Sequence, residues 1–310
     1  MKVLVTATDY DVLCRDGLEL LQNRGCEVIL SRYGRPPQID ELVTMAADVD
    51  ACIANMEPWN KISMDKAPKL KAIARFGTGY DSVDLEEAKK HGIVVTNCPG
   101  VNAPAVAEHD LTVMLALCHG VITGSGKTKK TENHLFGKTV GIIGLGNIGR
   151  CFAKLLKGFG ANVIVWNRTH KPELAAELGV EFVTLDELWS RSDFINITVA
   201  SNSETYHIVH QDSIEKMKDG VIIVNGARGP LVDEEAMAAA LRSGKVGGFA
   251  ADVLCKEPFD LSNPLMGLDN FICTPHSSGQ TYENYKNTGL MTAQAVLDVL
   301  DGKEPANRRA

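Results

Sequence analysis

Short apolar runs alternate with amphipathic stretches along almost the whole chain. In the first third, helical spacing appears around 15–23, 40–47 and 84–90, between apolar runs. Those runs predict strands at 2–6, 27–31, 51–55, 71–76 and 93–97. Such alternation is typical of a parallel sheet with helices on both faces.

A second series of strands begins at Thr139, after a long predicted helix at 104–118 and a polar segment. The later strands of this series are predicted at 162–166, 194–198, 221–225, 248–252 and 271–274. The last predicted helix, 282–300, follows the second sheet and can pack back on the first domain. The pattern therefore predicts two α/β domains, the first of them discontinuous.

A glycine-rich turn follows the first strand of the second series. Residues 144–149 read GLGNIG, and a helix predicted at 150–159 leaves the turn. In such a βαβ unit Gly144 permits the tight turn, Gly146 lets a pyrophosphate approach the backbone, and Gly149 lets helix and strand pack closely. The strand before and the helix after favour a dinucleotide site over a purely structural turn, so we expect a nicotinamide cofactor.

The composition of the 310 residues is ordinary for a globular protein, with 45% hydrophobic and 23% charged residues. A net charge of −7 argues against a nucleic-acid partner. No apolar run reaches about 18 residues, so no membrane partner is expected. The lysine cluster Lys127, Lys129 and Lys130 is interpreted as a solvated loop. Residues 126–128 read GKT, like the end of a phosphate-binding P-loop, but Val121 stands where that motif requires glycine, so a P-loop is not expected.

The eight cysteines contain no C-x-x-C pair and lie mostly in apolar segments, as reduced buried thiols do. The first residues run straight into a strand without a signal-peptide cleavage pattern. We therefore expect a cytoplasmic protein. Glu108-His109-Asp110 is interpreted as structural hydrogen bonding and no metal site is expected, because adjacent helix positions point in different directions.

Three residues follow strands of the second series and form a complete set for acid–base chemistry: Arg228, Glu257 and His276. Singly, they have ordinary alternatives: a surface cation, a solvated carboxylate and a polar residue beside a proline turn. Together, arginine offers a forked donor for a carboxylate, histidine exchanges a proton near neutrality, and glutamate orients the imidazole. Ligands bind outside the carboxyl ends of parallel strands, so the set predicts hydride transfer next to a carboxylate.

Several further motifs stand in register with these residues. They are RFGTGYDSVD at 75–84, NCPGVN at 97–102, AVAEH at 105–109, NGARGPLVDEEA at 225–236, ADVLCKEP at 251–258 and TPHSSGQT at 274–281. With GLGNIG, their order and spacing resemble the D-isomer-specific 2-hydroxyacid dehydrogenases, which include phosphoglycerate dehydrogenases and glyoxylate/hydroxypyruvate reductases. The match runs nearly end to end.

The resemblance implies two doubly wound parallel-sheet domains. These are a flavodoxin-like substrate domain, 1–100 plus 281–310, and a Rossmann cofactor domain, 101–280. It also implies that His276 is the general acid/base, Glu257 its orienting partner and Arg228 the anchor for the substrate carboxylate and α-oxygen. In the same way Asp252 is expected to hold the nicotinamide carboxamide.

The remaining contacts implied by the resemblance are expected from the glycine turn, the following strand end and loops of both domains. Cofactor contacts are expected from Gly144, Gly146, Asn147, Ile148, Gly149, Asn167, Arg168, Thr169, Val199, Gly226, Ala227, Asp252, Ser278 and Gly279. Substrate contacts are expected from Asn55, Met56, Gly77, Thr78, Gly79, Arg228 and His276.

The second strand of the cofactor unit departs from the NAD-preferring pattern. An acidic residue accepting hydrogen bonds from the ribose 2′-hydroxyl is expected there, but the chain has Asn167, followed by Arg168, Thr169 and Lys171. A carboxylate would repel a 2′-phosphate and an arginine would bind it. NADP is therefore the expected preference; the alternative is a solvated basic loop with NAD still accepted.

Two features bear on substrate and assembly. The loop 55–59 reads NMEPW. It contains Glu57 and lacks the cation with which phosphoglycerate dehydrogenases can meet a substrate phosphate. At 310 residues the chain is also expected to have no room for an appended regulatory domain. Both favour a small or apolar 2-keto acid. The segment 120–136 looks shorter than in relatives, where it contributes to dimerisation, but a homodimer is still expected. Alternatives are phosphoglycerate dehydrogenase, a dinucleotide-sensing corepressor of the same fold, and a structural NAD-binding subunit.

Overall fold

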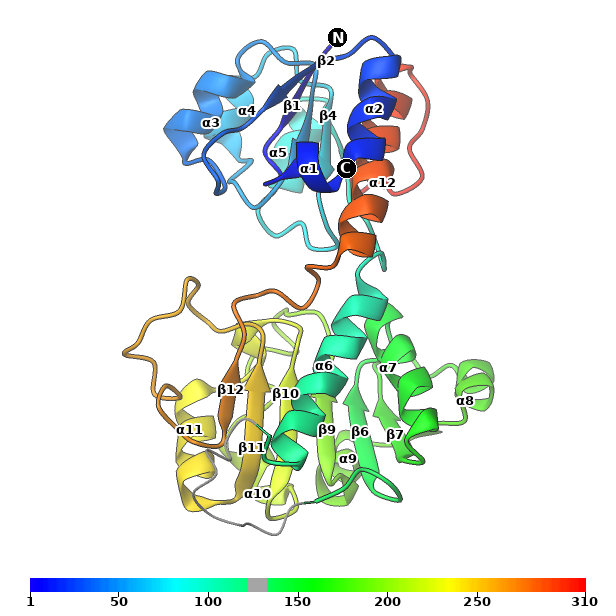
Figure 1. Ribbon diagram of the computed structural model, residues 1–310, viewed down its shortest axis with the longest axis vertical. Helices are drawn as coiled ribbons and strands as arrows, with labels where there is room; N and C mark the ends of the chain where they lie inside the picture. The colour runs from blue at the N-terminus through cyan, green and yellow to red at the C-terminus, as the bar shows by residue number, and fades with distance from the viewer. Residues whose placement is uncertain (122–132) are drawn as a thin grey trace. The chain divides into compact units, whose positions relative to one another are not determined.

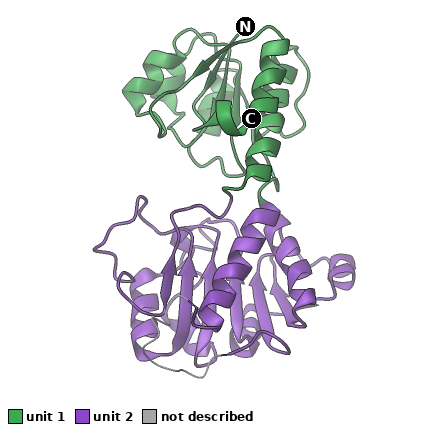
Figure 2. Ribbon diagram, viewed as in Figure 1, with its two compact units in different colours: residues 1–102, 280–310 green, residues 103–279 purple. Residues whose placement is uncertain are grey.

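The computed structural model describes residues 1–121 and 133–310. The chain forms two compact units, 1–102 with 280–310 and 103–279 (Figure 2). The lysine cluster 127–130 and the stretch 126–128 lie outside the described residues, as does most of the segment 120–136.

Unit 1 is a five-stranded parallel sheet in the order β2-β1-β3-β4-β5, which is the flavodoxin-like order. Its strands are β1 (Lys2–Val5), β2 (Glu27–Leu30), β3 (Ala51–Ala54), β4 (Ala72–Arg75) and β5 (Val94–Thr96). Its helices are α1 (Tyr10–Leu13), α2 (Arg15–Asn23), α3 (Ile39–Ala46), α4 (Lys61–Asp65), α5 (Leu85–Lys90) and α12 (Tyr282–Leu300).

Side chains alternate between the two faces of this sheet because the strand period is two residues. Val3 and Val5 pack with α2 and α12 on one face, while Leu4 packs with α3 and α4 on the other. The C-terminal helix α12 lies beside α2, so the two ends of the chain belong to one unit (Figure 1).

Unit 2 is a seven-stranded parallel sheet in the order β12-β11-β10-β9-β6-β7-β8. Its strands are β6 (Thr139–Ile143), β7 (Asn162–Trp166), β8 (Glu181–Phe182), β9 (Phe194–Ile197), β10 (Val221–Asn225), β11 (Val246–Ala251) and β12 (Phe271–Cys273). Its helices are α6 (Ala103–Cys118), α7 (Asn147–Gly158), α8 (Pro172–Leu178), α9 (Leu185–Arg191), α10 (Gln211–Lys216), α11 (Glu234–Ser243) and the 3₁₀ turn η1 (Gly229–Leu231).

The two faces of the second sheet carry separate hydrophobic cores. Helices α6 and α7 cover one face, and α9, α10 and α11 cover the other (Figure 1). The two parallel sheets with helices on both faces confirm the fold class expected from the sequence.

Three local features differ from the pattern expected from the sequence. Strand β8 has only two residues, too few for any periodicity to show. Helix α7 begins at Asn147 rather than at 150, so half of the glycine motif is already helical. Strand β11 begins at Val246, and a β-carbon at Gly247 would lie 2.5 Å from the carbonyl oxygen of Gly220, so this close approach requires glycine.

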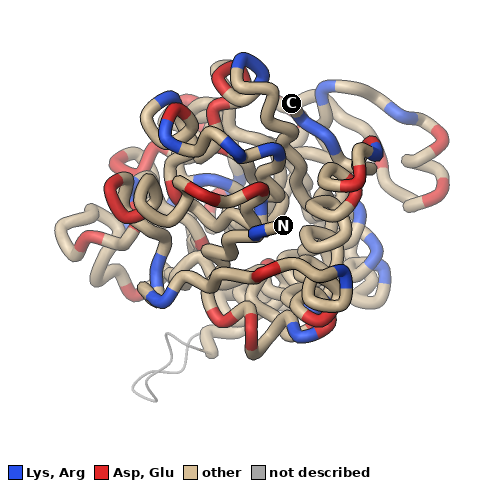
Figure 3. The backbone as a smooth tube through the Cα atoms, turned by 90° about the horizontal axis from the view of Figure 1, so that it is seen from above, with Lys and Arg blue, Asp and Glu red and all other residues tan. Residues whose placement is uncertain are grey.

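Charged residues of both signs are intermixed along the described chain (Figure 3). Many of them form surface ion pairs, such as Arg191–Glu181 and Lys245–Asp219. Among the described residues, no helix combines the length and hydropathy that a membrane crossing needs.

Candidate active site

The glycine turn between β6 and α7 is shaped by two close approaches. A β-carbon at Gly149 would lie 2.2 Å from the carbonyl oxygen of Gly144, and one at Gly144 would lie 2.8 Å from Cγ1 of Val199. Gly146, the N-cap residue of α7, has open space at its β-carbon position, and no side chain caps the helix. Backbone N–H groups at an uncapped helix start attract anions, so this turn fits the pyrophosphate of a dinucleotide.

The end of β7 is tied to the glycine turn. Oδ1 of Asn167 accepts a hydrogen bond from the backbone N–H of Leu145 at 3.0 Å, and its amide donates to the carbonyl oxygen of Thr169 at 2.7 Å. The next residue, Arg168, is largely exposed and forms an ion pair with Glu204, with 3.3 Å between Nη1 and Oε2. Glu204 lies 36 residues further along the chain, and no local pattern in the sequence connects it with this loop.

Three neighbouring strands, β10, β11 and β12, bring the predicted acid–base set to one edge of the sheet. His276 follows β12 and Glu257 follows β11, and Nδ1 of the imidazole lies 2.8 Å from Oε2 of the carboxylate. Both side chains are partly exposed, at 42% and 34%. A carboxylate at this distance fixes the orientation of the ring and directs Nδ1 toward itself.

The backbone of His276 is held in an unusual conformation by its neighbours. Its φ is +51°, in the left-handed region that residues other than glycine rarely adopt. Its N–H donates to the carbonyl oxygen of Asp252 at 2.9 Å, and the Asp252 carboxylate accepts from the backbone N–H groups of Ser277 and Ser278 at 2.8 and 2.9 Å. The buried Asp252 therefore fixes the turn that carries the imidazole.

Arg228 lies in a turn stabilised by Asn225, the last residue of β10. The Asn225 side chain donates to the carbonyl oxygen of Arg228 at 2.9 Å and accepts from the N–H of Ala227 at 3.1 Å. A β-carbon at Gly229 would lie 2.1 Å from the backbone of Leu254, so the loops after β10 and β11 touch. The sequence did not suggest Asn225, although a polar residue ending a buried strand is a usable signal.

The remaining predicted substrate residues lie in unit 1, after β3 and β4. Gly77 has φ +139°, and the Thr78 hydroxyl lies 2.9 Å from Oδ1 of Asn102. The Asn97 side chain donates to the carbonyl oxygen of Thr78 at 2.6 Å and accepts from Nε of Arg309 at 2.8 Å. The loop with Thr78 is thus supported by the C-terminal segment, which only the tertiary structure reveals.

The loop 55–59 has a cation beside it, contrary to the expectation from its own residues. Nη2 of Arg75, at the end of β4, lies 2.7 Å from the sulfur of Met56. Glu57, interpreted from the sequence as an added charge in this loop, is buried, and its Oε1 accepts from the hydroxyl of Thr6 at 2.5 Å and from Nε1 of Trp59 at 3.2 Å. Burial raises the pKa of its carboxyl group.

The residues Glu108-His109-Asp110 lie on α6, and His109 makes a hydrogen bond of the structural kind that the sequence favoured. Its Nε2 lies 3.1 Å from the hydroxyl of Thr274, after β12. Asp110 is completely buried, and a β-carbon at Gly226 would lie 2.3 Å from its Oδ1. Burial raises the pKa of the Asp110 carboxyl, while the nearby His109 and Asn196 side chains oppose that shift.

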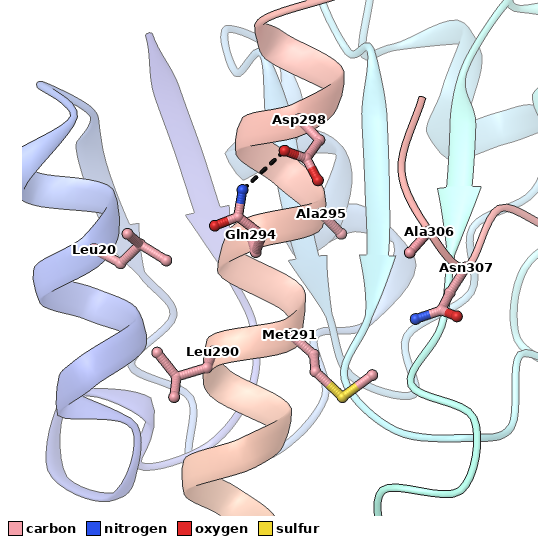
Figure 4. A pocket seen from close by; sticks show the side chains of 8 residues that line it. All are labelled: Leu20, Leu290, Met291, Gln294, Ala295, Asp298, Ala306 and Asn307. Carbon is pink, nitrogen blue, oxygen red and sulfur yellow. Dashed lines mark hydrogen bonds between the residues drawn. The ribbon is translucent and has the colours of Figure 1, made fainter. Parts of the chain in front are cut away.

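A pocket of about 380 Å³ lies elsewhere, on unit 1 between α2, α12 and the C-terminal segment (Figure 4). It is lined by Leu20, Leu290, Met291, Gln294, Ala295, Asp298, Ala306 and Asn307. Its one ionisable side chain, Asp298, accepts a hydrogen bond from Gln294 at 2.8 Å. No residue predicted to bind cofactor or substrate lines this pocket.

Comparison with known proteins agrees with this geometry. Residues 112–278 match the model of the D-isomer specific 2-hydroxyacid dehydrogenase NAD-binding domain. The chain is 38% identical to a hydroxypyruvate reductase of Thermotoga maritima, covering 94% of this chain and 96% of the relative. It is 34% identical to a glyoxylate reductase of Thermococcus litoralis, covering 94% and 92%.

Two further matches extend the comparison. A D-3-phosphoglycerate dehydrogenase of Methanocaldococcus jannaschii is 36% identical; the match covers 99% of this chain and 59% of that longer protein. Among solved structures, the TT0316 protein of Thermus thermophilus superposes with a TM-score of 0.92 at 34% identity, with both chains fully covered. The chain therefore belongs to the D-isomer specific 2-hydroxyacid dehydrogenases, oxidoreductases that use a nicotinamide dinucleotide and act on a CH–OH group.

Proposed function

We propose that the protein reduces a small 2-keto acid to the D-2-hydroxy acid, with NADPH as the preferred reductant. The observation that carries the proposal is the contact of 2.8 Å between Nδ1 of His276 and Oε2 of Glu257, at the sheet edge that also holds the glycine turn. A structural NAD-binding subunit has no need of an oriented acid–base pair. A dinucleotide-sensing corepressor can retain the pair, so turnover is what separates that alternative from the enzyme. The relatives named as glyoxylate and hydroxypyruvate reductases support the same substrate class.

The glycine turn would hold the pyrophosphate of the dinucleotide, and the bound cofactor would supply the hydride. His276 holds the proton that the α-oxygen takes up, and Glu257 keeps Nδ1 directed away from the substrate so that Nε2 faces it. The guanidinium of Arg228 anchors the substrate carboxylate through a forked pair of donors and stabilises negative charge developing on the α-oxygen. We also propose that the backbone of residues 77–79 contributes to carboxylate binding.

The preference for NADPH rests on the end of β7. Asn167 places no carboxylate where a 2′-phosphate would be repelled, and Arg168 and Lys171 supply positive charge after it. The ion pair with Glu204 holds the Arg168 side chain, and both groups are well exposed, so screening keeps this pair weak. A doubly charged phosphate competes well with one exposed carboxylate for the guanidinium.

Phosphoglycerate oxidation is a second candidate function, favoured by the Arg75 guanidinium beside Met56. A guanidinium can bind a phosphate, but Arg75 is buried and also donates to the carbonyl oxygen of Phe76, so its side chain would have to move to reach a substrate. The relationship to a D-3-phosphoglycerate dehydrogenase supports the same candidate. We further propose that the protein is cytoplasmic and forms a homodimer; sedimentation analysis of the purified chain tests the dimer.

The decisive experiment is the initial rate with NADPH and with NADH across glyoxylate, hydroxypyruvate, pyruvate, 2-ketoisocaproate and phosphohydroxypyruvate. Rapid oxidation of NADPH with one of the unphosphorylated acids supports the proposal. A rate confined to phosphohydroxypyruvate favours the second candidate. No turnover with cofactor binding intact, detected by NADPH fluorescence, contradicts the proposed activity and favours the sensor.

A further inference from the structure

A chain of hydrogen bonds leads from helix α6 to the turn that carries His276. The hydroxyl of Thr274 lies 2.5 Å from Oδ1 of Asp252 and 3.1 Å from Nε2 of His109. A hydroxyl has one hydrogen to donate, and an ionised carboxylate only accepts. Thr274 therefore donates to Asp252, and His109 donates its Nε2–H to Thr274, so this ring nitrogen carries a hydrogen.

The other end of the chain is the His276 turn. Asp252 accepts the backbone N–H groups of Ser277 and Ser278 through its carboxylate, and that of His276 through its carbonyl oxygen. The left-handed backbone at His276 persists only where several contacts fix it together. The same Oδ1 receives both the Ser277 amide and the Thr274 hydroxyl, so the orientation of the carboxylate depends on Thr274.

The imidazole of His109 is largely buried beside the next residue of its helix, Asp110. Nδ1 is buried and lies 3.7 Å from Oδ1 of the fully buried Asp110. Asp110 in turn packs against the backbone of Gly226, two residues before Arg228. A ring fixed by a rigid helix can hold the Thr274 hydroxyl in one rotamer, whereas a solvated partner could not.

We propose that His109 and Thr274 are positioning residues for the catalytic His276. His109 directs the Thr274 hydroxyl to Asp252, Thr274 fixes the Asp252 carboxylate, and Asp252 holds the two amides that follow the imidazole. Neither side chain exchanges a proton with substrate. The effect on the reaction rests on the proposed function. The chain of hydrogen bonds can be tested even if that function is wrong.

Four variants separate hydrogen bonding from packing. Thr274→Val removes the hydroxyl at constant shape, and Thr274→Ser keeps it. His109→Leu removes the donor, and His109→Gln keeps an N–H near the Nε2 position. We expect kcat to fall about tenfold in Thr274→Val and His109→Leu, with the KM for NADPH changed less than kcat, and to return close to wild type in Thr274→Ser and His109→Gln.

Amide hydrogen exchange of Ser277 and Ser278 in the protein without cofactor or substrate gives a second readout. Exchange at both amides should be faster in Thr274→Val and His109→Leu, and the double variant should lose no more than Thr274→Val alone. Wild-type exchange and kcat in both variants would overturn the inference, as would a Gln variant as damaged as the Leu variant. A wild-type protein that reduces no keto acid overturns the proposed function alone, since exchange still tests the hydrogen-bond chain.

Discussion

Gly17 and Gly289 meet where α2 crosses α12: a β-carbon at Gly17 would lie 2.6 Å from the carbonyl oxygen of Gly289. The hydroxyl of Tyr10 would be equally close, and it donates to that same carbonyl oxygen at 3.0 Å. The two helices of unit 1, from opposite ends of the chain, thus approach each other through a contact that has no room for a side chain. In α7, by contrast, a β-carbon at Gly158 would meet open space.

Substituting Gly17 in α2 and Gly158 in α7 by alanine should therefore have opposite effects on stability. Gly17→Ala should destabilise unit 1 by about 1–3 kcal/mol, because the backbone of Gly289 cannot yield as a flexible side chain would. Gly158→Ala should stabilise α7 by up to about 1 kcal/mol through helix propensity. Thermal melting, together with hydrogen exchange of peptides from α2, α12 and α7, measures both changes in stability. A Gly17→Ala variant as stable as the wild type would contradict the close contact between α2 and α12.

Substituting two glycines of the turn 144–149 should distinguish an effect on cofactor binding from an effect on folding. Gly146→Ala adds a methyl group in open space, so the fold should persist while the pyrophosphate is kept from the backbone. Gly149→Ala would bring a β-carbon to 2.2 Å from the carbonyl oxygen of Gly144 and should disrupt the turn itself. Circular dichroism and NADPH fluorescence titration test this. Undiminished NADPH binding by Gly146→Ala would exclude the turn as the pyrophosphate site.

Removing the imidazole should stop turnover without preventing cofactor binding. His276→Ala should lower kcat by about two to four orders of magnitude, because the proton donor is lost. Glu257→Gln should cost less, since an amide can still accept from Nδ1 but carries no charge. Steady-state rates with the best substrate of the panel, beside NADPH titrations, provide the measurement. Unchanged turnover in His276→Ala would refute the assigned role.

Arg168 and Glu204 should shift cofactor preference in opposite directions. Arg168→Asp should lower kcat/KM for NADPH by about 10- to 150-fold relative to NADH, because a charge-assisted contact to the 2′-phosphate is replaced by repulsion. Glu204→Gln should raise the ratio of kcat/KM for NADPH to kcat/KM for NADH by up to about fivefold, because the exposed carboxylate no longer competes for the guanidinium. Equal losses with both cofactors in Arg168→Asp would argue against 2′-phosphate recognition.

Asp110 should make the protein less stable as the pH rises. Its carboxyl pKa is raised above the ordinary value of 3.8 by burial, so the folded state binds more protons than the unfolded state. The free energy of unfolding should therefore decrease with pH from about 4 up to the raised pKa, and stay low above it. Asp110→Asn should remove this contribution. Its melting temperature should exceed that of the wild type by about 2 °C or more at pH 8, and by less at pH 4. The same difference at both pH values would contradict the prediction.

The alternation of strands and helices could be predicted because it depends on local periodicity and on residues adjacent in the chain. The turn 144–149 is of the same kind, since tight turns, uncapped helix starts and close approaches each demand glycine at a fixed spacing. The strand-end positions of Arg228, Glu257 and His276 followed as well, because parallel strands bring their carboxyl ends to one edge. A two-residue strand such as β8 carries too little pattern to be detected.

Only the tertiary structure decided which side chains meet. Arg75 beside Met56, Arg168 with Glu204, and His109 with Thr274, 165 residues apart in the chain, are contacts between segments distant in sequence. Hydrophobic periodicity gives the face on which a residue lies but not its neighbour across the sheet or helix, which depends on strand order and on how closely the backbones approach. For the same physical reason the sequence determined the fold and suggested the proposed catalytic set, whereas the side chains that contact that set appeared only when the sheet was assembled.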